Sequence, residues 1–88
     1  MDKQSYKEVI GQRLKEFRES RNISRYSVAQ KGKIRVEQVK AVEEGLTNYT
    51  IDAFLGYIAG SDLYMYFAEK DSENNLKDLI DKMPKRQE

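Results

Sequence analysis

Short segments of helical periodicity, separated by breaks of only a few residues, constrain the fold of this chain most. Four such segments precede residue 62, and each is followed by a glycine or by Asn22, residues that suit the left-handed position at a helix end. Helices this short are stable only when they pack against one another. With 88 residues there is room for one core. The chain is therefore predicted to be mainly α, with four to five short helices.

The first helix is predicted from one apolar face, with Ser5 as its N-cap and Glu8 completing a capping box. It is expected to run to about Ser20 or Arg21, and Asn22 then ends it. The apolar face recurs at spacings of four, four and three, and it is expected to lie in the core: Tyr6, Ile10, Leu14 and Phe17.

Two shorter helices come next, joined by a tight turn. The first begins at the N-cap Ser24, buries Val28 and Ala29, and is broken by Gly32. The second is predicted to begin near Arg35 or Val36 and to end at Gly45. At 100° per residue its inward face holds Val36, Val39, Val42 and Glu43, and its outer face holds Glu37, Ala41 and Glu44. Ile34, in the turn, is expected to fill the gap between the helices.

The rest of the chain is predicted to form a fourth helix, a strand and a terminal helix. Thr50 is the predicted N-cap of the fourth helix, which ends at Gly60 and whose buried face is expected to be Ile51, Phe54, Leu55 and Ile58. Residues 63–68, LYMYFA, alternate with period two and favour a strand, although a continuing helix is the alternative. Residues 74–83 place Leu76, Leu79, Ile80 and Met83 on one side of a short helix.

Composition narrows the classes of function. The chain has no cysteine and no histidine, which removes thiolate chemistry and the usual metal ligand and proton shuttle. The remaining titratable residues form no recognisable catalytic constellation, so no enzyme activity, metal or cofactor is expected. Neither a signal peptide nor an apolar run long enough to cross a bilayer is found. We therefore expect a cytoplasmic protein that does not enter a membrane.

The near-neutral net charge hides a strong asymmetry. Residues 1–35 contain ten bases and four acids, a net charge of +6, whereas residues 36–88 contain six bases and eleven acids, a net charge of −5. Such a division favours one face that meets a polyanion and another that does not. An ordinary solvated surface with segregated charges is the alternative.

Two short helices joined by a tight turn are typical of a helix-turn-helix, in which the second helix enters the major groove of DNA. The first helix of the pair then lies across the backbone, where Arg25 combines a positive charge with the N–H groups of a helix start. On this basis the predicted base contacts are Val36, Glu37, Gln38, Lys40 and Ala41. The predicted phosphate contacts are Arg25, Lys33, Arg35, Asn48 and Tyr49.

The residues from Ile10 to Leu63 resemble the Cro/repressor-type helix-turn-helix family, often called the XRE family. The resemblance is carried by Gly11, Leu14, Phe17, Arg18, Ile23, Ser24, Val28, Ala29, Ile34, Val39, Glu43, Gly45, Thr50, Leu55, Ile58 and Ala59. It implies a lambda-repressor-like bundle and sequence-specific binding to double-stranded DNA, usually as a dimer. Residues 1–62 would form the DNA-binding domain, and residues 63–88 a dimerisation extension of it.

The chain departs from this family at several positions. The family commonly has glutamine where Arg25 stands, leucine and glycine where Gly32 and Lys33 stand, and a serine or threonine cap where Arg35 stands. Losing that cap costs about 1 kcal/mol, and Lys33 would have to adopt a conformation that glycine finds easier. After Leu63 the family pattern ends.

The acids of the third helix have more than one interpretation. Glu37 can accept a hydrogen bond from cytosine N4, or it can simply complement the dipole at the start of its helix. For Glu44, we favour the interpretation that it keeps the helix soluble. Glu43 faces inward and is expected to orient the bundle by pairing with an arginine such as Arg13 or Arg18.

The predicted strand needs a partner for its backbone groups. It could pair with residues 1–4 or with the same strand of a second copy, and two-fold pairing would place two recognition helices on a palindromic site. The predicted dimerisation residues are Leu63, Tyr64, Met65, Tyr66 and Phe67. The expected function is that of a small homodimeric transcriptional regulator. The alternative is a protein-interaction module on the same fold, antitoxin-like or an adaptor, with weak or no DNA binding.

Overall fold

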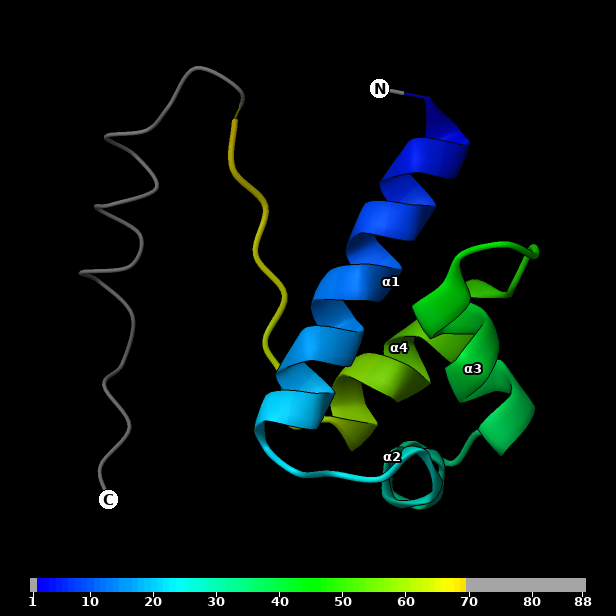
Figure 1. Ribbon diagram of the computed structural model, residues 1–88, viewed down its shortest axis with the longest axis vertical. Coiled ribbons are helices and arrows are strands. Elements are labelled where there is room, and N and C mark those ends of the chain that lie inside the picture. The colour runs from blue at the N-terminus through cyan, green and yellow to red at the C-terminus, as the bar shows by residue number, and fades with distance from the viewer. Residues whose placement is uncertain (1, 70–88) are drawn as a thin grey trace.

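Four α-helices make up the regular structure of residues 2–69, which are the residues that the computed structural model describes (Figure 1). They are α1 (Lys3–Ser20), α2 (Arg25–Gly32), α3 (Val36–Glu44) and α4 (Ile51–Gly60). In Figure 1, α1 runs down one side of the bundle, α3 lies on the other side, and α2 is seen end-on below them. The prediction of a mainly helical chain is confirmed.

Three of the helices begin at a residue whose side chain accepts a hydrogen bond from the backbone N–H three positions later. Asp2 accepts from Ser5 at 2.7 Å, and Ser24 and Thr50 cap α2 and α4 in the same way. The predicted caps of α2 and α4 are therefore confirmed. The predicted cap of α1 is wrong: Asp2 starts the helix three residues earlier, so Ser5 lies inside its first turns.

A residue in the left-handed backbone conformation follows each of α1, α2 and α3, which turns the chain sharply and keeps the connections short. Asn22 has φ 59°, Lys33 has φ 56° and Gly45 has φ 63°, a region that costs a residue with a side chain about 1 kcal/mol or more. The predicted helix ends at Asn22 and Gly45 are confirmed, and α2 ends at Gly32 as predicted, with Lys33 in the left-handed conformation after it. Lys33 adopts this strained conformation although it is not a glycine. It lies in the turn between α2 and α3, which is only three residues long.

Helices α2 and α4 approach through their backbones at glycines. A Cβ atom added to Gly32 would lie 2.0 Å from the carbonyl oxygen of Gly56, and one added to Gly60 would lie 2.2 Å from that of Val28. A Cβ atom on Gly56 would approach Cγ2 of Ile34 to 2.5 Å. Because packed interiors leave no room for such overlaps, the glycines set the distance between these helices.

A second close contact joins α1 to the end of α3. A Cβ atom on Gly11 would lie 2.3 Å from the carbonyl oxygen of Glu43, and one on Gly45 would lie 2.6 Å from that of Lys7. The side chain of Gln4 also donates a hydrogen bond of 2.7 Å to the carbonyl oxygen of Gly45. The first half of α1 therefore holds the C-terminal end of α3 in place.

The core contains fewer of the predicted apolar residues than the periodicity suggests. It consists of Leu14, Val28, Ala29, Val39, Val42 and Tyr57, with Ile34 packed against it as predicted. On α1 only Leu14 of the predicted stripe is buried. The prediction that Tyr6, Ile10 and Phe17 are core residues is wrong, because Gly11 and Leu14 turn a neighbouring face of α1 toward α3.

The buried face of α4 differs in part from the prediction: Phe54 and Ile58 pack against the core as predicted, although they are only partly buried. Its fully buried residues are Ala53, Tyr57 and Gly60, whereas Ile51 and Leu55 are exposed. The short side chains on the buried face let α4 lie directly against α2. Close backbone contact, rather than the largest apolar residues, therefore decides how α4 is turned.

Residues 63–69 form neither a strand nor a helix in the described chain. Leu63 packs against the core, but the strand predicted over 63–68 is not formed there, because no second strand lies within residues 2–69 to accept its backbone hydrogen bonds. The predicted terminal helix of residues 74–83 lies outside the described residues. Within them, none of the helices has the length and apolar character needed to cross a membrane.

Replacing Gly32 by alanine is expected to destabilise the fold by about 1–3 kcal/mol, because the new methyl group overlaps the backbone of α4. Within a helix, alanine is normally more stable than glycine by about 1 kcal/mol, so the sign of the change identifies the close contact. Urea denaturation followed by circular dichroism measures it. Gln30→Ala, exposed on the same helix, is the control, and a Gly32→Ala protein as stable as the wild type would contradict this packing.

Candidate nucleic-acid interface

The turn between α2 and α3 is anchored in the core. The backbone N–H of Ile34 donates to the carbonyl oxygen of Ala29 at 3.0 Å, which closes the end of α2. The side chain of Ile34 packs against the core and against Gly56 of α4. The start of α3 is thus held at a fixed position relative to α2 and α4.

Helix α3 presents the outer face that its periodicity predicts. Val39, Val42 and Glu43 are buried, whereas Glu37, Lys40 and Glu44 are exposed. Ala41 lies among the exposed residues and is partly buried. Val36, which periodicity places near the inward face, is 39% exposed at the first turn.

Two of the predicted base contacts have partners within the helix. The side-chain oxygen of Gln38 accepts a hydrogen bond of 2.8 Å from the backbone N–H of Arg35 and so serves the start of α3. The Arg35 side chain makes no capping bond, because a guanidinium group has no acceptor for the N–H groups at a helix start. Lys40 forms a 3.9 Å ion pair with Glu44, one turn further along. Glu37 has no side-chain hydrogen bond in the described part of the chain, and the methyl group of Ala41 can form none.

The predicted phosphate contacts divide into two groups. Lys33 and Arg35 are exposed in the turn before α3, and Arg25 begins α2. Asn48 accepts a 3.0 Å hydrogen bond from the ammonium of Lys7, and the ring of Tyr49 is half-buried. That ring stacks on Phe54 with centroids 6.2 Å apart, and burial raises its pKa. Lys33 and Arg35 are therefore exposed to solvent, Arg25 is partly buried, and Asn48 and Tyr49 also hold the loop.

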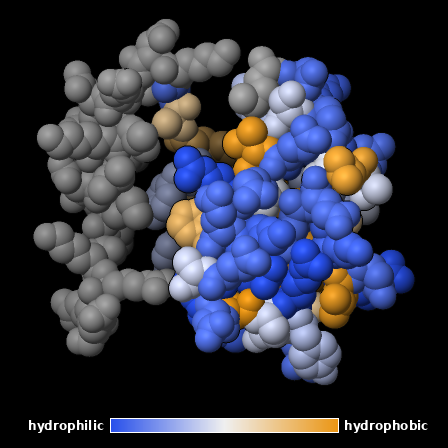
Figure 2. Space-filling view, in the orientation of Figure 1, coloured by the Kyte–Doolittle hydropathy of each residue, from blue (hydrophilic) through white to orange (hydrophobic). Residues whose placement is uncertain are grey.

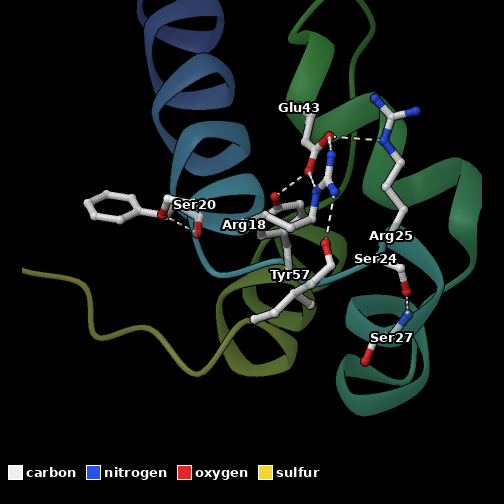
Figure 3. Close-up of polar contacts among 9 residues, drawn as sticks. Arg18, Ser20, Ser24, Arg25, Ser27, Glu43 and Tyr57 are labelled. Atoms are coloured by element: carbon white, nitrogen blue, oxygen red, sulfur yellow. Dashed lines mark hydrogen bonds and ion pairs between the residues drawn. The ribbon is translucent and has the colours of Figure 1, made fainter.

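One carboxylate joins all four helices (Figure 3). Oε2 of Glu43, on α3, accepts a 2.5 Å bond from Nε of Arg18, on α1, and a bond from the hydroxyl of Tyr57, on α4. Oε1 accepts from Nη2 of Arg18 at 3.1 Å and from Nε of Arg25, on α2, at 3.0 Å. The expected pairing of Glu43 with an arginine is confirmed for Arg18, whereas Arg13 is exposed and lies near Glu16.

These bonds determine the charge states in the network. Burial on its own raises the pKa of Glu43, but hydrogen bonds from Arg18, Tyr57 and Arg25 outweigh burial and lower it. Burial and the bond to Glu43 raise the pKa of Tyr57, so its hydroxyl keeps the proton that it donates. The hydrogen bond to Glu43 raises the pKa of Arg18. The network therefore combines one carboxylate with two guanidinium groups.

Arg18 and Arg25 differ in how far they reach toward solvent. The side chain of Arg18 is 10% exposed, and its Nη1 donates to the carbonyl oxygen of Ile23 at 2.9 Å. The side chain of Arg25 is 34% exposed, and it lines a cleft of about 380 Å³ together with Lys15, Glu44 and Leu46. Arg25 is therefore the surface member of an otherwise buried network.

The predicted dimerisation residues are divided between core and surface. Leu63 packs against the core, whereas Tyr64, Tyr66 and Phe67 are exposed and Met65 is 40% exposed. The ring centroids of Tyr64 and Tyr66 lie 6.4 Å apart. Figure 2 shows that one face of the molecule is mostly hydrophilic, with separate hydrophobic side chains between the charged ones. Four consecutive residues after α4 thus expose large apolar side chains, as do four residues of α1.

The sequence reasoning missed two members of the network, Tyr57 and Arg25. Tyr57 has a recognisable signal, because Ala53, Tyr57 and Gly60 recur at spacings of four and three, a helical face in which a large polar aromatic stands between small residues. Arg25 has no such signal, because whether a base at a helix start points to solvent or to a carboxylate depends on the neighbouring helix.

Comparisons of the chain with protein-family models, curated proteins and solved structures find no match. The resemblance to Cro/repressor-type proteins therefore depends on the residues quoted for it in the sequence analysis. The described residues form a bundle of four helices, which gives the position of each predicted contact.

Replacing Glu43 by glutamine is expected to lower the free energy of unfolding by about 3–5 kcal/mol at pH 7, because two guanidinium groups lose their common carboxylate. The pKa of Glu43 is lowered from 4.5 in the folded protein. Its ionised form therefore stabilises the fold above the unfolded pKa, and this contribution is lost as the pH falls through the lowered value.

The difference between wild type and Glu43→Gln should accordingly shrink as the pH falls below the ordinary pKa of 4.5, as measured by urea denaturation at a series of pH values from 7 downward. Glu44→Gln, the same change at the exposed neighbouring residue, is the control and should alter stability by at most about 0.5 kcal/mol at pH 7. A difference for Glu43→Gln that stays constant over this range would count against a role for its charge.

Proposed function

We propose that this chain is a Cro/repressor-type transcriptional regulator that binds double-stranded DNA with sequence specificity, with α2 and α3 as its helix-turn-helix. The observation that carries the proposal is the exposed outer face of α3, which follows a three-residue turn anchored by Ile34. A helix that is fixed at its start and exposed along one face can enter the major groove.

Recognition of bases would come from the exposed side chains of α3. Glu37 can accept a hydrogen bond from cytosine N4, and Lys40 can donate to guanine. Val36 and Ala41 offer apolar contact to thymine methyl groups. Gln38 would have to leave its bond to the backbone of Arg35 before it could address adenine, so we assign it a secondary role.

The affinity would come from positive charge around the acids of α3. Arg25, Lys33 and Arg35 stand at the start of α2 and in the turn before α3, where they can meet phosphates on either side of the groove. Phosphate contacts supply most of the affinity in protein–DNA complexes. Glu37 and Glu44 lower the affinity for DNA in general, which favours a protein that binds few sites well.

Two copies would be joined through the residues that follow α4. The exposed side chains of Tyr64, Met65, Tyr66 and Phe67 offer apolar surface, and two-fold pairing of residues 63–68 would supply the partner that this segment lacks within the described chain. A homodimer would present two α3 helices to a palindromic site.

A second candidate is supported by the same exposed groups. Carboxylates at Glu37 and Glu44, together with aromatic side chains after α4, would suit a protein partner better than a phosphate backbone. In that case the chain would be an interaction module of the antitoxin or adaptor kind, with weak or no DNA binding.

A salt titration of binding to a mixed-sequence duplex separates the two candidates. If the proposal holds, the logarithm of the affinity falls linearly with the logarithm of the salt concentration, with a slope near −0.9 for each phosphate contacted. Selection of bound sites from a random duplex library should then return palindromic sequences with half-sites about one helical turn apart. Absence of binding even at low salt would favour the protein partner.

Replacing Glu37 by alanine is expected to relax the sequence preference at one base pair in each half-site, because the acceptor for cytosine N4 is removed. The loss of discrimination should be about 1–3 kcal/mol, measured as the ratio of affinities for the selected site and for the site changed at that position. Glu44→Ala is the matched control and should leave the preference unchanged. If Glu37→Ala instead binds every sequence more tightly and to the same extent, Glu37 does not recognise a base.

A further inference from the structure

The charge of the Glu43 network is not balanced. Arg18 alone neutralises Glu43, because its Nε and Nη2 reach both carboxylate oxygens and its Nη1 is bound by the carbonyl oxygen of Ile23. Arg25 adds a second positive charge to this pair. A buried carboxylate that already has a bidentate partner and a tyrosine hydroxyl needs no further cation, so Arg25 requires another explanation.

The way in which Arg25 is held suggests that explanation. Its Nε donates to Oε1 of Glu43 at 3.0 Å, and within residues 2–69 this is the only hydrogen bond of its guanidinium group. Figure 3 shows the two Nη atoms on the far side of the group, turned away from the carboxylate. The inner edge of the guanidinium is thus fixed and its outer edge is presented to solvent at the start of α2.

We propose that Glu43 positions Arg25 for a phosphate group: the carboxylate fixes Nε, and the two Nη groups then donate to phosphate oxygens of the duplex. This inference depends on the proposed DNA-binding function and specifies how one contact of that surface is made. It follows from the shape of the side chain, since arginine can donate from different edges to two acceptors at once, whereas lysine has a single ammonium group.

A fixed guanidinium group binds phosphate better than a mobile one, because it has less conformational entropy left to lose on binding. A long basic side chain on the surface loses rotamer freedom when it is immobilised, and the bond to Glu43 removes part of that freedom before DNA arrives. Glu43 would therefore act on DNA through Arg25, without touching DNA, as a positioning residue.

The test compares the same conservative substitution at two arginines. Arg25→Lys keeps the charge, but its single nitrogen cannot fill both the place of Nε beside Glu43 and the places of the Nη atoms, whereas Arg13→Lys makes the same change at an arginine of α1 whose side chain is 74% exposed and lies outside the proposed interface. We expect Arg25→Lys to weaken duplex binding about tenfold, close to Arg25→Ala, and to reduce the salt slope by about 0.9. Arg13→Lys should stay within about twofold of the wild type with an unchanged slope.

A double-mutant cycle links the effect to Glu43. In a Glu43→Gln background, the loss of affinity caused by Arg25→Lys should largely disappear, because the bond that positions the arginine is weakened. Thermal denaturation of each variant shows whether it is folded at the temperature of the assay. If Glu43→Gln does not fold, the comparison of Arg25→Lys with Arg13→Lys still decides the matter.

Each other outcome overturns the inference. Wild-type affinity and slope in Arg25→Lys would show a plain charge contact that needs no positioning. Wild-type affinity in both Arg25→Lys and Arg25→Ala, even with lower stability, would show that Arg25 serves the fold alone. If the wild-type protein itself fails to bind duplex at low salt, the proposed function fails first, and the inference fails with it; in the other cases DNA binding stands.

Discussion

The structure depends on one buried carboxylate, that of Glu43. It accepts hydrogen bonds from Arg18, Arg25 and Tyr57, so each of the four helices contributes one residue to a single polar cluster. An unpaired charge in the core would cost several kcal/mol, and this cost makes the arrangement of the helices mutually dependent. Moving any one helix would leave a charged or polar group without its partner, which favours a single arrangement over alternative packings of such short helices.

Glycine contacts supply the second constraint, and they explain why the carboxylate can reach its partners. Gly11 lets α1 approach the backbone of α3 at Glu43 itself, and Gly32 and Gly60 let α2 and α4 meet backbone to backbone. With the helices this close, a core of mostly small and medium-sized side chains is sufficient. The same contacts hold α3 from its inner side, so its outer face remains exposed for the proposed contact with DNA.

The candidate site was predictable in part. The exposed face of α3 with Glu37, Lys40 and Glu44 follows directly from helical periodicity once Val39 and Val42 are assigned to the core. The partner of Asn48 did not follow, because that hydrogen bond depends on Lys7, which α1 brings near. The basic residues were foreseen as a group, but the division of Arg25 between Glu43 and solvent depends on the position of α2 against α3.

By itself, the sequence determined where the helices begin and end. Ser24 and Thr50 as caps and Asn22 and Gly45 in left-handed conformations act on backbone groups within a few residues, so their effect can be read locally. Only the tertiary structure decided which faces are buried. Both α1 and α4 carry more apolar residues than one neighbour can cover, and close contact at glycines selected Leu14 over Phe17 and Tyr57 over Leu55. The physical reason is that capping bonds are local in the chain, whereas burial depends on how near another helix can come.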